Sequence, residues 1–182
     1  TARTDSATKI GAAVLELLRT RGPSAVTIEG VAERSGVART TIYRRFADRN
    51  EMLTDALRGL AHVGESATHD GSGAGRLRWV VEHAASMILD GIGYGGFAAL
   101  LTDADPAFTA AFRSVLQAHR KVLADQLRSG VDDGTLRLSG DIETTVDSLV
   151  GALLAEYART GALAGDWVDR VIAVHSGLIV AD

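Results

Sequence analysis

The stretch "VAERSGVARTTIYRRF", residues 31–46, has a spacing of small and apolar residues that leaves few folds open to this chain. Ala32 lies four residues before Gly36, and Ile42 lies six residues after it. A small side chain lets two helices approach closely, and a glycine can take the positive φ that a tight turn needs. The spacing therefore predicts two short helices that cross steeply around a shared apolar core, which is a helix-turn-helix.

The second of these helices should carry a polar outward face. With Ile42 and Phe46 turned inward, the opposite face holds arginine, threonine and tyrosine side chains, which can hydrogen-bond to phosphates or to base edges. Arg39 or Arg44 can reach the O6 and N7 atoms of a guanine, and Arg49 can clamp a phosphate at the start of the next helix. Arginines on an exposed helix often serve only solubility, but here they coincide with a helix-turn-helix core. The residues that we expect at the DNA are Thr27, Arg39, Thr40, Thr41, Tyr43, Arg44, Arg45 and Arg49.

The charge distribution agrees with a local contact to a polyanion. The net charge is -4 overall, which argues against a general nucleic-acid binder. Residues 1–60 hold ten basic and seven acidic side chains, whereas residues 61–182 hold nine basic and sixteen acidic ones. A basic head on an acidic body is the pattern expected where only the head meets DNA.

Apolar periodicity and capping residues predict an all-α protein of about nine helices. Neither an alternating strand pattern nor an internal repeat is present in the sequence. The segments "GESATHDGSGAG", residues 64–75, and "DGIGYGG", residues 90–96, should interrupt the helices because they are rich in glycine. We expect helices at residues 5–21, 28–34, 38–45, 49–64, 77–89, 97–102, 106–131, 142–160 and 166–179, with Thr27, Asp48, Asp105 and Asp141 as N-caps.

Residues 27–53, "TIEGVAERSGVARTTIYRRFADRNEML", resemble the N-terminal domain of TetR-type transcriptional repressors. The resemblance extends from about Lys9 to Leu60 and implies a three-helix DNA-binding head. Three positions depart from the family pattern: Ala38 stands where serine often caps the recognition helix, Arg45 stands where histidine is common, and Gly30 interrupts the second helix at a cost of about 1 kcal/mol.

The resemblance also implies a C-terminal ligand cavity and dimer interface. Two apolar stripes can line a cavity with imidazoles as polar handles, although such stripes are more often plain core. Their members, the predicted ligand contacts, are Trp79, His83, Met87, Phe108, Phe112, Leu116 and His119. Two later stripes can pair with a second copy as a four-helix bundle, or can partly face their own core. Their members, the predicted dimer contacts, are Leu149, Val150, Leu153, Leu154, Tyr157, Val168, Val171, Ile172, His175, Leu178 and Ile179.

Several classes of protein are disfavoured by what the sequence lacks. The five histidines have no paired metal-ligand spacing, and no phosphate-binding loop or nucleophile elbow is present. We therefore expect no enzyme, no cofactor and no metal site. Cysteine is absent, which excludes disulfides and fits a reducing compartment. The N-terminus lacks the apolar core of a signal peptide, so we expect a cytoplasmic protein with no membrane partner.

Taken together, these features predict a homodimeric repressor that binds double-stranded DNA and is released by a small molecule. Residues 1–50 would form the helix-turn-helix domain, and residues 51–182 the helical ligand-binding and dimerisation domain. Two alternatives stay open. One is a regulator of the same family that needs no ligand or that activates transcription, and the other is a ligand-binding protein whose DNA head is vestigial.

Overall fold

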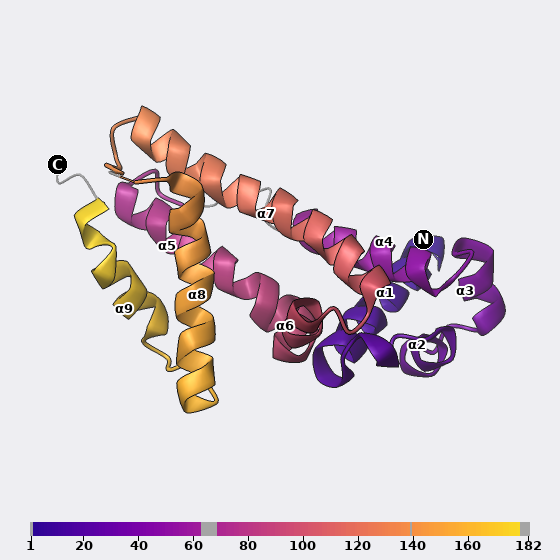
Figure 1. Ribbon diagram of the computed structural model, residues 1–182. Coiled ribbons are helices and arrows are strands. Elements are labelled where there is room, and N and C mark those ends of the chain that lie inside the picture. Colours follow the sequence, from indigo (N-terminus) through magenta and orange to yellow (C-terminus); the bar gives the residue numbers. More distant parts are fainter. Residues whose placement is uncertain (1, 63–68, 139, 179–182) are drawn as a thin grey trace. The chain divides into compact units, whose positions relative to one another are not determined.

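The computed structural model describes residues 2–62, 69–138 and 140–178, and in this part of the chain the regular elements are helices (Figure 1). The predicted all-α class is therefore confirmed. The described residues form nine α-helices: α1 (Ala2–Arg21), α2 (Ile28–Ser35), α3 (Arg39–Arg45), α4 (Arg49–His62), α5 (Gly73–Ser86), α6 (Gly93–Thr102), α7 (Pro106–Asp132), α8 (Ile142–Thr160) and α9 (Trp167–Val174). Short 3₁₀ helices, η1 (Pro23–Ala25) and η3 (Ser176–Leu178), and a π-helical turn, η2 (Met87–Ile92), complete the order.

By packing, the chain divides into two compact units. Unit 1 comprises Thr1–Val63 and Met87–Gln117, and unit 2 comprises Gly64–Ser86 and Ala118–Asp182. Helix α7 therefore contributes residues to both units. The boundary expected between residues 50 and 51 is a division by function, and it stays a prediction.

Unit 1 is built around α1, which packs against α2, α4, η2 and α6. The apolar periodicity predicted for α1 is confirmed, because Ile10, Val14, Leu17 and Leu18 are all buried. They share one core with residues of α3, α4 and η2, and with Phe108 and other residues at the start of α7. An ion pair between Glu16 on α1 and Arg34 on α2 adds a polar tie on the surface of this unit.

The helix-turn-helix has the expected local structure. Thr27 caps α2 by accepting a hydrogen bond from the Gly30 N–H, and Gly36 ends α2 at a φ of 68°. Ala38 makes no side-chain cap at the start of α3, as its methyl group requires. Ile42 is fully buried and Phe46 is 4% exposed. The turn and the shared core therefore follow the predicted spacing.

The structure explains Gly30, which the sequence alone does not. A Cβ at this position would lie 3.0 Å from the carbonyl oxygen of Ala25 and 3.2 Å from the Thr27 hydroxyl. Glycine therefore lets the first turn of α2 pass close to the preceding 3₁₀ turn.

Unit 2 is formed by α5, the second part of α7, α8 and α9. Helix α5 packs against both α8 and α9. Buried Arg76 on α5 donates to the carboxylate of Asp133, just beyond α7, at 2.7 Å. Asp141 caps α8 as predicted, because its carboxylate accepts a hydrogen bond from the Thr144 N–H.

Two expectations about helix boundaries were wrong. The "DGIGYGG" segment does not end a helix, since α5 continues through the π turn η2 into α6. Gly93 has a φ of 69°, and a Cβ there would lie 2.9 Å from the carbonyl oxygen of Arg19. Gly93 therefore allows a close contact between this helical stretch and α1. Helix α9 ends at Val174, five residues before the expected end, and Ile179 lies outside the described residues.

One helical stretch, Gly73–Thr102, is long and apolar enough to cross a membrane by length and composition alone. Half of its most apolar window is buried inside the protein. Within this stretch α5 packs on α8 and α9, and α6 packs on α1. We therefore interpret the stretch as a core helix of the protein. A buried core helix can be as long and as apolar as a membrane-spanning one.

Candidate nucleic-acid interface

The outward face of α3 presents the side chains expected at DNA. Arg39, Thr40, Tyr43, Arg44 and Arg45 are all exposed, and Thr41 is half-buried. Tyr43 is 55% exposed, although a large aromatic ring would gain from burial. The structure thus brings six of the eight predicted DNA residues together on one short helix.

The arginines of α3 differ in their surroundings. Arg39 lies 3.8 Å from Glu29 on α2, and both side chains are well exposed. Arg45 extends over the ring of Phe46, with 5.6 Å between the guanidinium carbon and the ring centroid. Among the described residues neither Arg44 nor Arg45 has an ion pair. Among the three arginines of α3, Arg44 is therefore the one with neither an ion pair nor a ring contact to another described residue.

Thr27, the seventh predicted contact, lies at the N-cap of α2 and is exposed. Its hydroxyl oxygen accepts a hydrogen bond of 3.0 Å from the Gly30 N–H. A hydroxyl that accepts one bond can still donate its proton to another group. Thr27 can therefore cap α2 and donate to a phosphate at the same time.

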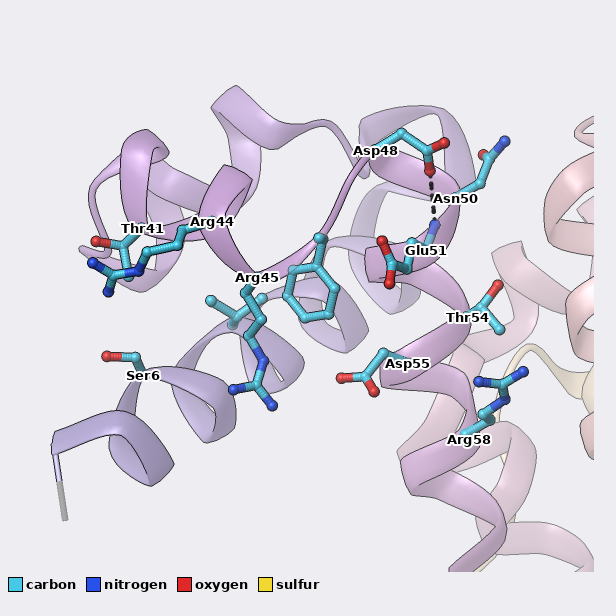
Figure 2. Close-up of a pocket in the computed structure, with 12 residues that line it drawn as sticks. Ser6, Thr41, Arg44, Arg45, Asp48, Asn50, Glu51, Thr54, Asp55 and Arg58 are labelled. Atoms are coloured by element: carbon cyan, nitrogen blue, oxygen red, sulfur yellow. Dashed lines mark hydrogen bonds between the residues drawn. The ribbon is translucent and has the colours of Figure 1, made fainter.

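A groove of about 1170 Å³ runs beside α3, between α1 and α4. Figure 2 shows Thr41, Arg44 and Arg45 on its α3 side, with Asp55 on its α4 side. The α3 wall is basic, whereas the opposite wall carries Asp48 just before α4, and Glu51, Asp55 and Arg58 on α4, so acidic residues outnumber basic ones there. A polyanion would therefore be attracted to α3 and repelled by α4. Sequence reasoning missed the groove, because it forms where three helices meet and no local pattern marks it.

The acidic residues at the start of α4 have a structural role. Asp48 accepts a hydrogen bond from the Glu51 N–H at 2.9 Å, and Glu51 in turn accepts one from the Ala47 N–H at 2.6 Å. This reciprocal pattern resembles a capping box, which satisfies backbone donors at a helix start. The predicted capping role of Asp48 is confirmed.

The seven predicted ligand contacts are distributed over both units. Those in unit 1 belong to or pack against its apolar core, and they are Met87, Phe108, Phe112 and Leu116. In unit 2 the Trp79 and His83 rings stack, with centroids 3.9 Å apart. His119 donates its Nε2–H to the backbone oxygen of His83 at 3.0 Å. Burial lowers the pKa of His119, which keeps the ring neutral at neutral pH.

The predicted dimer contacts on α8 and α9 differ in how far they are buried within unit 2. Leu149, Leu153 and Val171 are buried in their own unit. The side chain of Leu178 lies outside the description. The partly exposed members are Val150, Leu154, Tyr157, Val168, Ile172 and His175.

Two family profiles match this chain. The profile described as bacterial regulatory proteins, tetR family, matches residues 10–56. The profile described as tetracyclin repressor-like, C-terminal domain, matches residues 67–174, which is more than half of the chain. The chain belongs to the TetR family. It is therefore a DNA-binding transcriptional regulator and not an enzyme.

Individual members with the TetR fold are only distantly similar. The uncharacterized HTH-type transcriptional regulator YdeS of Bacillus subtilis (strain 168) is 26% identical over 173 residues, which cover 90% of this chain and 84% of YdeS. The reduced form of E. coli NemR has a TM-score of 0.71 at 14% identity, covering 97% of this chain and 99% of that one. FadR of Bacillus subtilis, solved with stearoyl-CoA, has a TM-score of 0.63 at 16% identity, covering 94% and 97%.

The eighth predicted DNA residue of this TetR-family chain, Arg49, is placed differently from our expectation. Its guanidinium donates to the backbone oxygens of Val26 and Pro23, and to the carboxylate of Asp105, each at 2.6 Å. Only 27% of its side chain is exposed. Three of its five N–H donors are thus used within unit 1, and the phosphate contact of Arg49 stays a prediction.

Sequence reasoning missed Asp105 as a partner of Arg49. It correctly identified Asp105 as the N-cap of α7, where the carboxylate accepts a hydrogen bond from the Phe108 N–H at 3.0 Å. Partial burial alone would raise the pKa of Asp105, but the Phe108 N–H and the Arg49 guanidinium together hold it below its usual range. The two residues are 56 positions apart, so no local pattern predicts their contact.

Proposed function

We propose that this TetR-family regulator is a cytoplasmic, homodimeric repressor that a small molecule releases from a pseudo-palindromic operator. The observation that carries the DNA-binding part is the division of α3 into two faces. Ile42 and Phe46 anchor one face in the core, and Arg39, Tyr43 and Arg44 are exposed on the other. A helix held by its apolar face can enter a major groove with its polar face leading.

Dimerisation is supported by the apolar side chains that unit 2 leaves accessible. On α8, Val150 and Leu154 are partly exposed, and on α9 Val168 and Ile172 are partly exposed. Val174, beside them on α9, is 82% exposed. Two helices from each of two copies can bury such faces in a symmetric bundle. The dimer would place two α3 helices on half-sites about one DNA turn apart.

Ligand binding is supported by two unsatisfied ring nitrogens in unit 2. Among the described residues, the buried Nε1 of Trp79 and Nδ1 of His119 have no hydrogen-bond partner. The first is a donor, and the second is an acceptor because His119 donates through Nε2. We infer a ligand that offers both an acceptor and a donor, such as a hydroxyl or an amide. FadR, which has this fold, was solved with stearoyl-CoA, so the fold can hold a small molecule.

Release from DNA requires a ligand that binds the released arrangement more tightly than the DNA-bound one. The shift in operator affinity equals this difference in ligand affinity, by thermodynamic linkage. A ligand with equal affinity for both arrangements would leave the affinity for the operator unchanged.

The decisive experiment is selection of sequences from a random duplex library by the full chain. We expect an enriched inverted repeat, with half-sites about one helical turn apart. Recovery of no enriched sequence would contradict the repressor and would favour a small-molecule-binding protein with a vestigial head. Transcription from a promoter that carries the selected repeat then separates a repressor from an activator.

A further inference from the structure

Arg49, the first residue of α4, connects three segments of unit 1. Its Nε–H donates to the carbonyl oxygen of Val26, directly before the Thr27 N-cap of α2. Its Nη2 donates both to the carbonyl oxygen of Pro23 in η1 and to the Asp105 carboxylate. The guanidinium thus joins the starts of α4 and α2 to the N-cap of α7.

The geometry leaves few N–H groups of Arg49 available to bind a DNA phosphate. A guanidinium has five N–H groups, and three of them are used by these acceptors. Nη1 also lies 3.3 Å from the Asn50 side-chain oxygen. Only Nη1 could reach a phosphate without replacing bonds of 2.6 Å that are partly shielded from water, where charge-assisted hydrogen bonds are strong.

Asp105 is the charged partner that holds this arrangement. One carboxylate oxygen caps α7 through the Phe108 N–H, and the other accepts from Arg49. Phe108 and Phe112 on the next turns of α7 are fully buried in the core of unit 1. The carboxylate is therefore fixed on the core and can in turn fix the guanidinium.

We propose that Asp105, which lies outside the helix-turn-helix, is a positioning residue for DNA binding. Through Arg49 it fixes Val26 and hence the start of α2, on which Thr27 and the following α3 depend for their position. The proposal rests on the DNA binding of the family, and it needs neither the ligand nor the dimer.

The variant Asp105→Asn separates positioning from electrostatics, because the two effects have opposite signs. Asparagine retains the capping oxygen for α7 but removes the charge that holds Arg49. Loss of a negative charge should by itself strengthen DNA binding. Loss of positioning should weaken affinity for the selected repeat about tenfold, the order of one charge-assisted hydrogen bond, without changing the salt slope.

Asp141→Asn is the matched control. Asp141 also caps a helix, accepting a hydrogen bond of 2.7 Å from the Thr144 N–H, but it lies in unit 2. The control has the same change in charge and the same type of capping residue, so its affinity should stay near that of the wild type. Urea unfolding confirms that both variants are folded at the assay temperature.

Two Arg49 variants distinguish the internal connection from a phosphate contact. Arg49→Ala should weaken binding with an unchanged salt slope, whereas loss of a phosphate contact would lower the slope by about one. Arg49→Lys keeps the charge but cannot bridge three acceptors. It should therefore bind as weakly as Asp105→Asn. A lower slope in Arg49→Ala, or unchanged or tighter binding by folded Asp105→Asn, would overturn the proposal.

Hydrogen exchange tests the same arrangement without DNA. The amides at the start of α2 should exchange faster in Asp105→Asn than in the wild type, and at the wild-type rate in Asp141→Asn. Equal rates in the wild type and Asp105→Asn would contradict the positioning role. This readout applies even if the full chain selects no sequence, so failure of the proposed repressor function can be told apart from failure of this inference.

Discussion

A Cβ on Gly30 would lie 3.0 Å from the carbonyl oxygen of Ala25. This is closer than side chains normally approach a backbone oxygen, and the Thr27 hydroxyl would lie only 3.2 Å from the same Cβ. Neither atom can easily yield, because Thr27 caps α2 and Ala25 ends η1. The close approach therefore favours glycine inside the helix despite its poor helix propensity.

Gly30→Ala should lower the free energy of unfolding by about 1 kcal/mol, because crowding outweighs the helix propensity of alanine, itself about 1 kcal/mol. Gly11→Ala is the control, because nothing lies within 4 Å of the added methyl group inside α1. It should raise the free energy of unfolding by about 0.5–1 kcal/mol. Urea unfolding measures both, and a Gly30→Ala variant more stable than the wild type would show that the turn adjusts freely.

Arg44→Ala should relax the base preference at one position of the operator, because Arg44 lies on the exposed face of α3 without an ion pair to another described residue. Arg45→Ala should weaken binding to all DNA sequences by a similar factor. It should also lower the salt slope by about one, as expected for a phosphate contact. Selection and titration over a range of salt concentrations measure both effects. A uniform loss in Arg44→Ala would exclude it as a base reader.

The stability of the protein should depend on pH through His119. Because burial lowers the pKa of folded His119, the unfolded chain binds more protons as the pH falls below about 6.5. The free energy of unfolding is therefore greatest above that pH, and it falls as the pH drops toward the lowered pKa of the folded state. The free energy of unfolding should therefore rise with pH in the region below about 6.5 more steeply in the wild type than in His119→Gln. Identical slopes would show that this imidazole does not contribute.

Leu154→Asp should convert the proposed dimer to a monomer, because it places a charge among the accessible apolar side chains of α8 and α9. Leu101→Asp is the control, since Leu101 is 71% exposed on α6 in unit 1. Sedimentation should give about twice the monomer mass for the wild type and the control. A monomeric wild type at micromolar concentration would contradict the proposed bundle.

Local physics explains what could be predicted from the sequence. The N-caps Thr27, Asp48, Asp105 and Asp141 were all correctly predicted, because a cap bonds to a backbone N–H three residues away. The turn at Gly36 and the buried side of α3 likewise depend on spacings of a few residues.

Contacts between distant segments could not be predicted. The partners of Arg49 lie 23, 26 and 56 residues away, so its guanidinium resembled a free phosphate ligand in the sequence. The "DGIGYGG" segment resembled a break, because its contact with Arg19 is invisible to local composition. In both cases the role of a residue is set by its contacts with a segment that is distant in the sequence.

The shared core of unit 1 has a consequence for protein engineering. The helices of the helix-turn-helix share a core with apolar side chains from much later in the sequence, including Phe108 and Phe112 of α7. During synthesis, most of the chain must therefore leave the ribosome before the core around the helix-turn-helix can be completed. Grafting residues 1–62 onto another regulator would leave that core open, and a working chimera should carry residues 87–117 with it.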